Sequence, residues 1–125
     1  MQKLGPKQLR WVEALESGEF KQGNGFLKRN LDGELLYCCL GVLNELEGFP
    51  SVCVSNGIFT FSLTNSASLD STQMDRVMLY SNVGSFTESI NGYSSLANMN
   101  DSGLSFKEIA KVIRENPEKV FSKEA

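Results

Sequence analysis

Two segments of the N-terminal half space their apolar residues as an amphipathic helix does. Residues 5–18, GPKQLRWVEALESG, place Pro6 in the first turn and end at Gly18, a residue typical of a helix stop. In residues 37–48, YCCLGVLNELEG, four apolar side chains fall at i, i+3, i+4 and i+7, and these are Cys39, Val42, Leu43 and Leu46. The spacing predicts two helices that each bury one stripe.

Residues 104–117, LSFKEIAKVIRENP, predict the clearest helix of the chain. Ser105 and Glu108 have the spacing of a capping box, and Pro117 ends the helical pattern. The apolar stripe between them consists of Phe106, Ile109, Ala110 and Ile113. This helix is therefore expected to pack one face on the core.

Alternating β-branched and aromatic residues on both sides of Asn56-Gly57 predict a hairpin, because this dipeptide favours two-residue turns. With such a turn, Val54 lies opposite Phe59. One packed face of the hairpin then consists of Val52, Val54, Phe59 and Phe61. A free edge of this hairpin would be a place for a homodimer to form.

Other segments carry weaker patterns. A short helix is expected from about Ser71, and a helical turn in residues 95–103. Asn91-Gly92 is compatible with a second hairpin, but the serine-rich flanks leave that interpretation open. The glycines of residues 19–34 predict loop and turn. The short tail after Pro117, with Val120 and Phe121, is expected to dock back on the core.

Length and composition favour one α+β domain over residues 1–125, with three to four helices packed against one or two β-hairpins. No apolar run reaches the roughly 18 residues of a membrane span, so no membrane partner is expected. The first residues lack the apolar stretch of a secretory leader, which makes the cytoplasm the expected location.

Charge is unevenly distributed along the chain. Residues 1–29 carry six basic and three acidic groups, whereas residues 30–104 carry Arg76 against eight acidic groups. The basic residues near the two ends alternate with Glu, a pattern typical of solvated helix faces rather than of a duplex-binding surface. We therefore expect no double-stranded nucleic acid as partner. Three cations remain candidates for binding a small anionic molecule, namely Lys21, Lys28 and Arg29.

The absence of histidine removes Ser-His-Asp and Cys-His catalysis within the chain. Three cysteines without a C-x-x-C pair do not form a structural zinc site, so neither a metal nor a cofactor is expected. Cys38 and Cys39 lie at the start of a predicted helix, where a thiol pKa is lowered. Helical spacing assigns Cys39 to the core and leaves Cys38 as the possible reactive thiol.

Two polar motifs supply candidate ligand-binding residues. KQGNG, residues 21–25, offers Lys21 and Gln22 beside glycines whose backbone could contact a ligand. NMND, residues 98–101, offers the amide of Asn100 and the carboxylate of Asp101. The alternative interpretations are a glycine turn for the first motif and a helix stop with an Asx turn for the second. Whether the two motifs form one pocket is left open by the sequence.

Three motifs together resemble a family of small proteins encoded mostly by phages and prophages. They are WVEALESGEFKQGNGFL (11–27), YCCLGVL (37–43) and LANMNDSGLSFKEIAKVI (96–113). Relatives often have a further cysteine directly after the second motif, where this chain has Asn44. The resemblance implies a viral accessory protein that acts in the cytoplasm of an infected bacterium, and it supplies no mechanism.

Three functions follow as hypotheses. The first is a non-enzymatic binder that inhibits or sequesters a host component, either a host defence protein or a nucleotide-like signal. The second is a structural or regulatory adaptor that binds a protein partner. The third is a hydrolase that depends on Cys38 or on the carboxylate of Asp101, and it requires an exposed thiol or a carboxyl with a raised pKa in a cleft.

Overall fold

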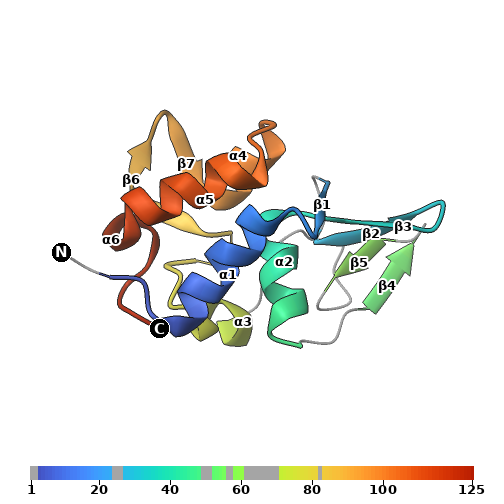
Figure 1. The fold of residues 1–125 in the computed structure, drawn as a ribbon, viewed down its shortest axis with the longest axis horizontal. Coiled ribbons are helices and arrows are strands. Elements are labelled where there is room, and N and C mark those ends of the chain that lie inside the picture. The colour runs from blue at the N-terminus through green and yellow to red at the C-terminus, as the bar shows by residue number, and fades with distance from the viewer. Residues whose placement is uncertain (1–2, 24–26, 49–51, 56–57, 61–70, 82) are drawn as a thin grey trace.

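A computed structural model describes residues 3–23, 27–48, 52–55, 58–60, 71–81 and 83–125 of the chain (Figure 1). The helices are α1 (Pro6–Ser17), α2 (Cys39–Leu46), α3 (Ser71–Arg76), α4 (Leu96–Asp101), α5 (Phe106–Glu115) and α6 (Pro117–Val120). The strands are β1 (Lys21–Gln22), β2 (Lys28–Leu31), β3 (Glu34–Tyr37), β4 (Val52–Ser55), β5 (Ile58–Thr60), β6 (Ser85–Ile90) and β7 (Tyr93–Ser95). The predicted α+β class is confirmed.

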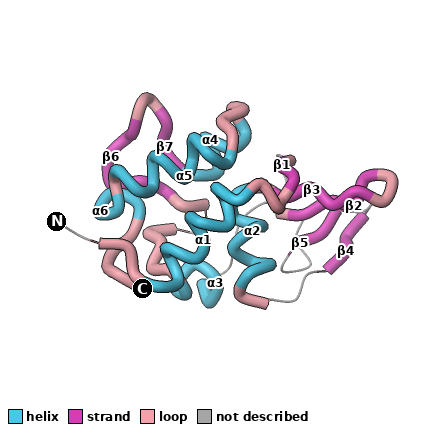
Figure 2. The backbone as a smooth tube through the Cα atoms, viewed as in Figure 1, coloured by secondary structure: helices cyan, strands magenta, loops and turns pink. Residues whose placement is uncertain are grey.

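Helix α1 lies between α5 and α2 and packs against both (Figures 1 and 2). Its buried side chains include Trp11, whose indole donates to the Cys39 carbonyl at 2.9 Å and whose ring meets Phe121 edge to face. Phe121 and Val120 are fully buried, so the predicted docking of the C-terminal tail is confirmed. Helix α5 buries the predicted stripe and has the predicted capping box between Ser105 and Glu108.

A five-stranded sheet follows the order β1-β3-β2-β5-β4, and β1 is its parallel member (Figure 1). Three of these strands fall in residues 19–37, where the sequence predicted loop and the beginning of a helix. Strands β2 and β3 form a two-stranded ribbon, residues 28–37, around Asp32-Gly33. Both turn residues have positive φ, 53° and 88°, as a two-residue hairpin turn requires. The prediction of loop and turn at residues 19–34 was therefore wrong at β1 and β2, whereas the turn that it placed at Gly33 is present.

Strands β4 and β5 form the hairpin predicted around Asn56-Gly57, a turn that lies outside the described residues. The predicted register was wrong. Ser55 lies opposite Ile58, but Phe59 faces Cys53 instead of Val54, because the register shifts between Cys53 and Ser55. The face that was predicted to carry Val52, Val54, Phe59 and Phe61 concerns side chains outside the described part of the structure.

A separate two-stranded sheet, β6–β7, turns at Asn91-Gly92, so the second hairpin left open by the sequence is present. The short helix α3 begins at Ser71 as predicted. Helix α4 directly follows β7, and Ser95 caps it by accepting the Asn98 amide at 3.0 Å. Figure 1 shows the β6–β7 hairpin apart from the five-stranded sheet, and α4 connects it to α5.

Helix α2 begins two residues later than the pattern in residues 37–48 predicted. Tyr37 ends β3, and Cys38 is the N-cap, with its sulfur accepting the Gly41 amide at 3.4 Å. A Cβ at Gly41 would collide with the Leu27 backbone carbonyl. Glycine at position 41 is thus required because α2 and the chain entering β2 touch backbone to backbone.

The two ends of the described chain lie together (Figure 1). The Ala125 carbonyl accepts the Lys7 and Gln8 amides at 3.0 and 3.2 Å, which satisfies free donors in the first turn of α1. The fully buried Gln8 side chain donates to the carbonyls of Val77 and Lys123, both at 2.8 Å. One buried amide therefore joins three distant segments. No helix of the described residues is long and apolar enough to cross a membrane.

Candidate functional site

The Gln22 side chain links β1 to the start of α5. Its amide nitrogen donates to the Leu104 carbonyl at 2.6 Å and to the Asn100 side-chain oxygen at 3.0 Å. Its amide oxygen accepts the Phe106 backbone N–H at 3.1 Å. Phe106 is the first residue of α5, so its N–H has no partner within the helix. Gln22 therefore supplies a hydrogen-bond partner that α5 cannot supply itself.

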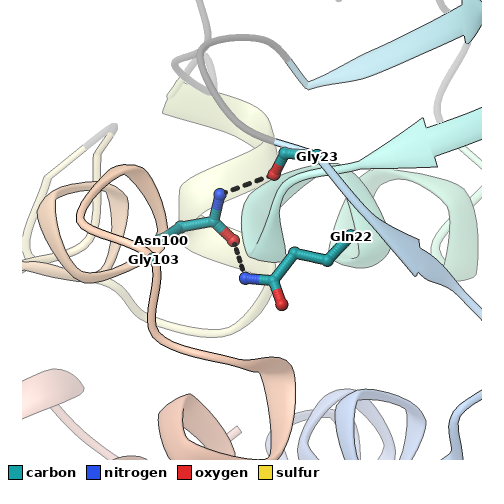
Figure 3. A pocket seen from close by; sticks show the side chains of 4 residues that line it. All are labelled: Gln22, Gly23, Asn100 and Gly103. Carbon is teal, nitrogen blue, oxygen red and sulfur yellow. Dashed lines mark hydrogen bonds between the residues drawn. The ribbon is translucent and has the colours of Figure 1, made fainter.

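Asn100 supplies a hydrogen-bond partner of the same kind at the start of α2. Its side-chain oxygen accepts the backbone N–H of Cys39, the first residue of α2, at 3.2 Å, in addition to the bond from Gln22. Its amide nitrogen donates to the Gly23 carbonyl at 2.8 Å. Asn100 is only 1% exposed, so each of these bonds replaces one with water. Figure 3 shows the two side chains and Gly23 pointing toward one another.

We name the side chains of Gln22 and Asn100, with their backbone partners, the polar node. Two residues that the sequence offered as ligand-binding candidates thus lie side by side, so KQGNG and NMND do meet in space. Their amides, however, already bond to groups of the fold from β1, α2, α4 and the start of α5. The node is arranged to hold these elements together.

An open pocket of about 280 Å³ adjoins the node and is lined by Gln22, Gly23, Asn100 and Gly103 (Figure 3). The other two candidates do not line it. Lys21 precedes Gln22 on β1, and its ammonium lies 2.8 Å from the Glu34 carboxylate on the exposed sheet. Asp101 is exposed at the end of α4. The structure thus brings together Gln22 and Asn100, and places Lys21 and Asp101 elsewhere.

Cys38 and Cys39 are free and buried, with the Cys38 side chain capping α2. Burial raises the pKa of the Cys38 thiol to about 11, which outweighs the lowering by backbone N–H groups at the helix start. Burial also raises the pKa of Cys39 well above its usual value. A reactive thiol needs exposure and a lowered pKa, so both observations disfavour the reactive-thiol hypothesis for Cys38.

The other candidate cations are also engaged. Lys28 lies 3.5 Å from the Glu45 carboxylate and 5.9 Å from the centre of the Tyr37 ring. Tyr37 donates its hydroxyl to Glu45 at 3.1 Å, and burial together with that carboxylate raises the tyrosine pKa to about 12. Arg29 also interacts with another group of the protein. Lys28 and Tyr37 thus anchor the ribbon to α2.

The tip of the β2–β3 ribbon carries the feature that the sequence did not predict. Leu31 and Leu35 are 46% and 39% exposed, although both are large and apolar. Leu31 lies opposite Glu34, and Leu35 lies opposite Asn30, so the two leucines occupy opposite faces of the ribbon. The Asp32-Gly33 dipeptide was the available signal for this hairpin. Each face of the projecting ribbon therefore has one large apolar side chain that is available to another molecule.

Comparison with protein families finds one match, a model described as "Domain of unknown function (DUF8296)", over residues 6–48. The matched range contains Gln22, Cys38, Cys39 and the whole ribbon, but covers less than half of the chain and ends before Asn100. No curated protein and no solved structure matches. Among the described residues, no group of three or more acidic, cysteine or histidine side chains is arranged to hold a metal ion.

Proposed function

We propose that this chain is a small phage-type accessory protein that binds a host protein without catalysing a reaction. The resemblance of its motifs to phage and prophage proteins supports the setting, which is the cytoplasm of an infected bacterium. A host defence protein is a fitting target for such a binder. The function would then be inhibition or sequestration of that target.

The observation that carries the proposal is the exposure of Leu31 and Leu35 on the β2–β3 ribbon. The ribbon extends from the helical part of the molecule (Figure 1). The face of Leu35 continues along the ribbon to Lys28 and Tyr37, which contact Glu45 of α2. A host protein seated on this face would cover Leu35 and reach the exposed end of α2. Apolar side chains surrounded by charged ones are typical of protein interfaces.

A small anionic ligand, such as a nucleotide-like signal, has less support. Such a ligand would need cations that are available to it. The ammonium of Lys28 lies against the Glu45 carboxylate, and Lys21 lies on the exposed sheet and does not line the pocket beside the polar node. Among the described residues, no charged side chain lines the pocket beside the polar node. These observations favour a protein target over an anionic small molecule.

The adaptor hypothesis uses the same surface and differs only in the outcome of binding. A hydrolase is disfavoured because the described thiols are buried with raised pKa values. The carboxylate of Asp101 is exposed and does not line the pocket beside the node. A general acid or base is expected to lie in a cleft that restricts water, and the exposed carboxylate of Asp101 does not.

Binding can be tested with tagged protein recovered from infected cells, using Leu35→Asp and a matched control, Tyr80→Ser. Tyr80 is 43% exposed but lies outside the ribbon. We expect a host protein to be recovered with wild type and with Tyr80→Ser and to be lost with Leu35→Asp. The purified pair should then show an affinity at least about tenfold weaker for Leu35→Asp, as for an interface anchor. Equal binding by all three proteins would contradict the proposal.

A further inference from the structure

The second face of the ribbon has a composition of its own. The strand register places Leu31 and Glu34 on this face, together with Leu36 and Arg29, because residues directly opposite one another share a face. Strand β1 adds Lys21, which lies opposite Leu36. We name Lys21, Arg29, Leu31, Glu34 and Leu36 the Leu31 face. It is the opposite face to the one on which Tyr37 and Lys28 meet Glu45 of α2.

The outer part of the Leu31 face is open to water. Leu31 is 46% exposed, and the side chains of Lys21 and Glu34 are 66% and 53% exposed. Their 2.8 Å ion pair lies beside an apolar side chain that nothing in the described structure covers fully. An exposed pair of this kind contributes little to stability, since water competes for both charges. Either group can therefore exchange its partner at little cost.

A two-fold symmetric interface requires a surface that is complementary to itself. The exposed outer part of the Leu31 face meets this requirement, because it holds one cation, Lys21, and one anion, Glu34, close to Leu31. When two copies meet face to face, Lys21 of each can approach Glu34 of the other while the two Leu31 side chains leave water together. We propose that the Leu31 face pairs with the same face of a second copy, forming a homodimer.

This inference is independent of the host target, because the Leu35 face stays open in such a dimer. It also predicts a dimer with two equivalent host-binding faces. A dimer formed by the edge of β4 would instead leave the Leu31 face exposed. The two arrangements therefore respond differently to substitutions on the ribbon.

Sedimentation analysis of the full chain between about 10 and about 500 µM tests the proposal, since a reversible dimer follows mass action. We expect a concentration-dependent dimer for wild type. Leu31→Asp should raise the dimer dissociation constant by about thirtyfold or more, as for a central interface residue. Leu35→Asp is the matched control on the opposite face and should leave the constant unchanged. A monomer at every concentration, or equal effects of the two substitutions, would overturn the inference.

A charge exchange provides a second test that does not depend on the leucines. Lys21→Glu and Glu34→Lys each place like charges on the face and should weaken the dimer by about fivefold. The double variant restores one cation and one anion and should recover dimerisation. Circular dichroism of each variant shows whether the fold is kept. A dimer that is insensitive to both single substitutions, or a double variant weaker than either, would overturn the proposed pairing.

Discussion

The polar node, through Gln22 of β1, and the tip of the β2–β3 ribbon belong to the same five-stranded sheet, yet they use their side chains in opposite ways. At the node, the polar side chains of Gln22 and Asn100 are partly or fully buried, and they bond to backbone groups of Gly23, of Cys39 at the start of α2, and of Leu104 and Phe106 at the start of α5. At the ribbon tip, Leu31 and Leu35 are apolar and exposed. Polar groups are expected outside and apolar groups inside, so both regions depart from the general rule.

The two departures have different consequences. A buried amide with its partners in place fixes the relative position of several elements, and losing it leaves other buried groups without partners. An exposed leucine contributes little to the fold and remains available to another molecule. The comparison therefore assigns stability to the node and interaction to the ribbon. Substitutions at each region, ordered by the size of their expected effect, test this assignment.

The largest effect on stability is expected where α2 touches the entry to β2. Gly41→Ala should lower the free energy of unfolding by about 3 kcal/mol, because the added Cβ meets a backbone carbonyl that cannot rotate away. Gly48→Ala is the control, since a Cβ there meets nothing and only its positive φ resists substitution, at about 1 kcal/mol. Urea denaturation measures both, and equal losses would show that the contact with Leu27 is unimportant.

Asn100→Ala should cost about 3 kcal/mol, because it leaves the buried Cys39 N–H and the partly buried Gly23 carbonyl without their partner. Asn98→Ala removes one longer bond, 3.3 Å to the Ser94 amide, from an exposed side chain of the same helix. It should change stability by less than about 0.5 kcal/mol. If Asn100→Ala changed stability as little as Asn98→Ala, the node would be free to serve a ligand rather than the fold.

Thiol labelling of the native protein tests the burial of Cys38. At pH 8 a pKa of about 11 leaves very little thiolate, and the buried sulfur is shielded from reagent. We expect labelling at least about a hundredfold slower than in urea-unfolded protein, with a rate that follows unfolding. Fast labelling of native protein would revive the hypothesis of a reactive thiol.

Substitutions in the ribbon should lower the free energy of unfolding much less than substitutions in the node. Leu31→Asp and Leu35→Asp should each lower the free energy of unfolding by less than about 1 kcal/mol, since both side chains are exposed next to a turn. Thermal denaturation measures this, and a loss equal to that of Asn100→Ala would mean that the leucines belong to the core.

The smallest effect concerns the surface contact between α1 and α5. Arg114 bonds to both carboxylate oxygens of Glu16, at 2.6 and 2.7 Å, and this lowers the pKa of Glu16. A lowered folded-state pKa gives stability that is present above the unfolded pKa and lost as the pH falls through the folded one. Glu16→Gln should remove this loss of stability at acid pH, which is worth less than about 0.5 kcal/mol at the surface. Glu115→Gln is the control and should leave that loss unchanged.

Local patterns in the sequence predicted local structure. The Ser105–Glu108 capping box, the Asn91-Gly92 turn and the buried stripe of α5 depend on residues a few positions apart, and all are present. The ribbon was missed because its strands are short and the glycines suggested loop, although Asp32-Gly33 is a hairpin signal. Its exposed leucines do not alternate with polar residues as a half-buried strand does.

Long-range features were not predictable in the same way. The meeting of Gln22 with Asn100 spans most of the chain, and neither motif shows which amide faces which backbone group. The predicted register of β4 and β5 was wrong because the hydrophobic pattern does not indicate the register shift at Val54. Cys38 was predicted inside the helix, but tertiary contact makes it the N-cap next to the Leu27 carbonyl.

Amide hydrogen exchange measured by NMR tests the role of the node most directly. The amides of Cys39 and Phe106 are first-turn helix donors, which normally exchange rapidly because they lack a helical partner. Here they donate to Asn100 and Gln22, so the account predicts slow exchange approaching that of global unfolding. Lys107, in the same turn of α5, has no such side-chain acceptor among the described residues and should exchange rapidly. Exchange of Cys39 and Phe106 as fast as that of Lys107 would contradict the account.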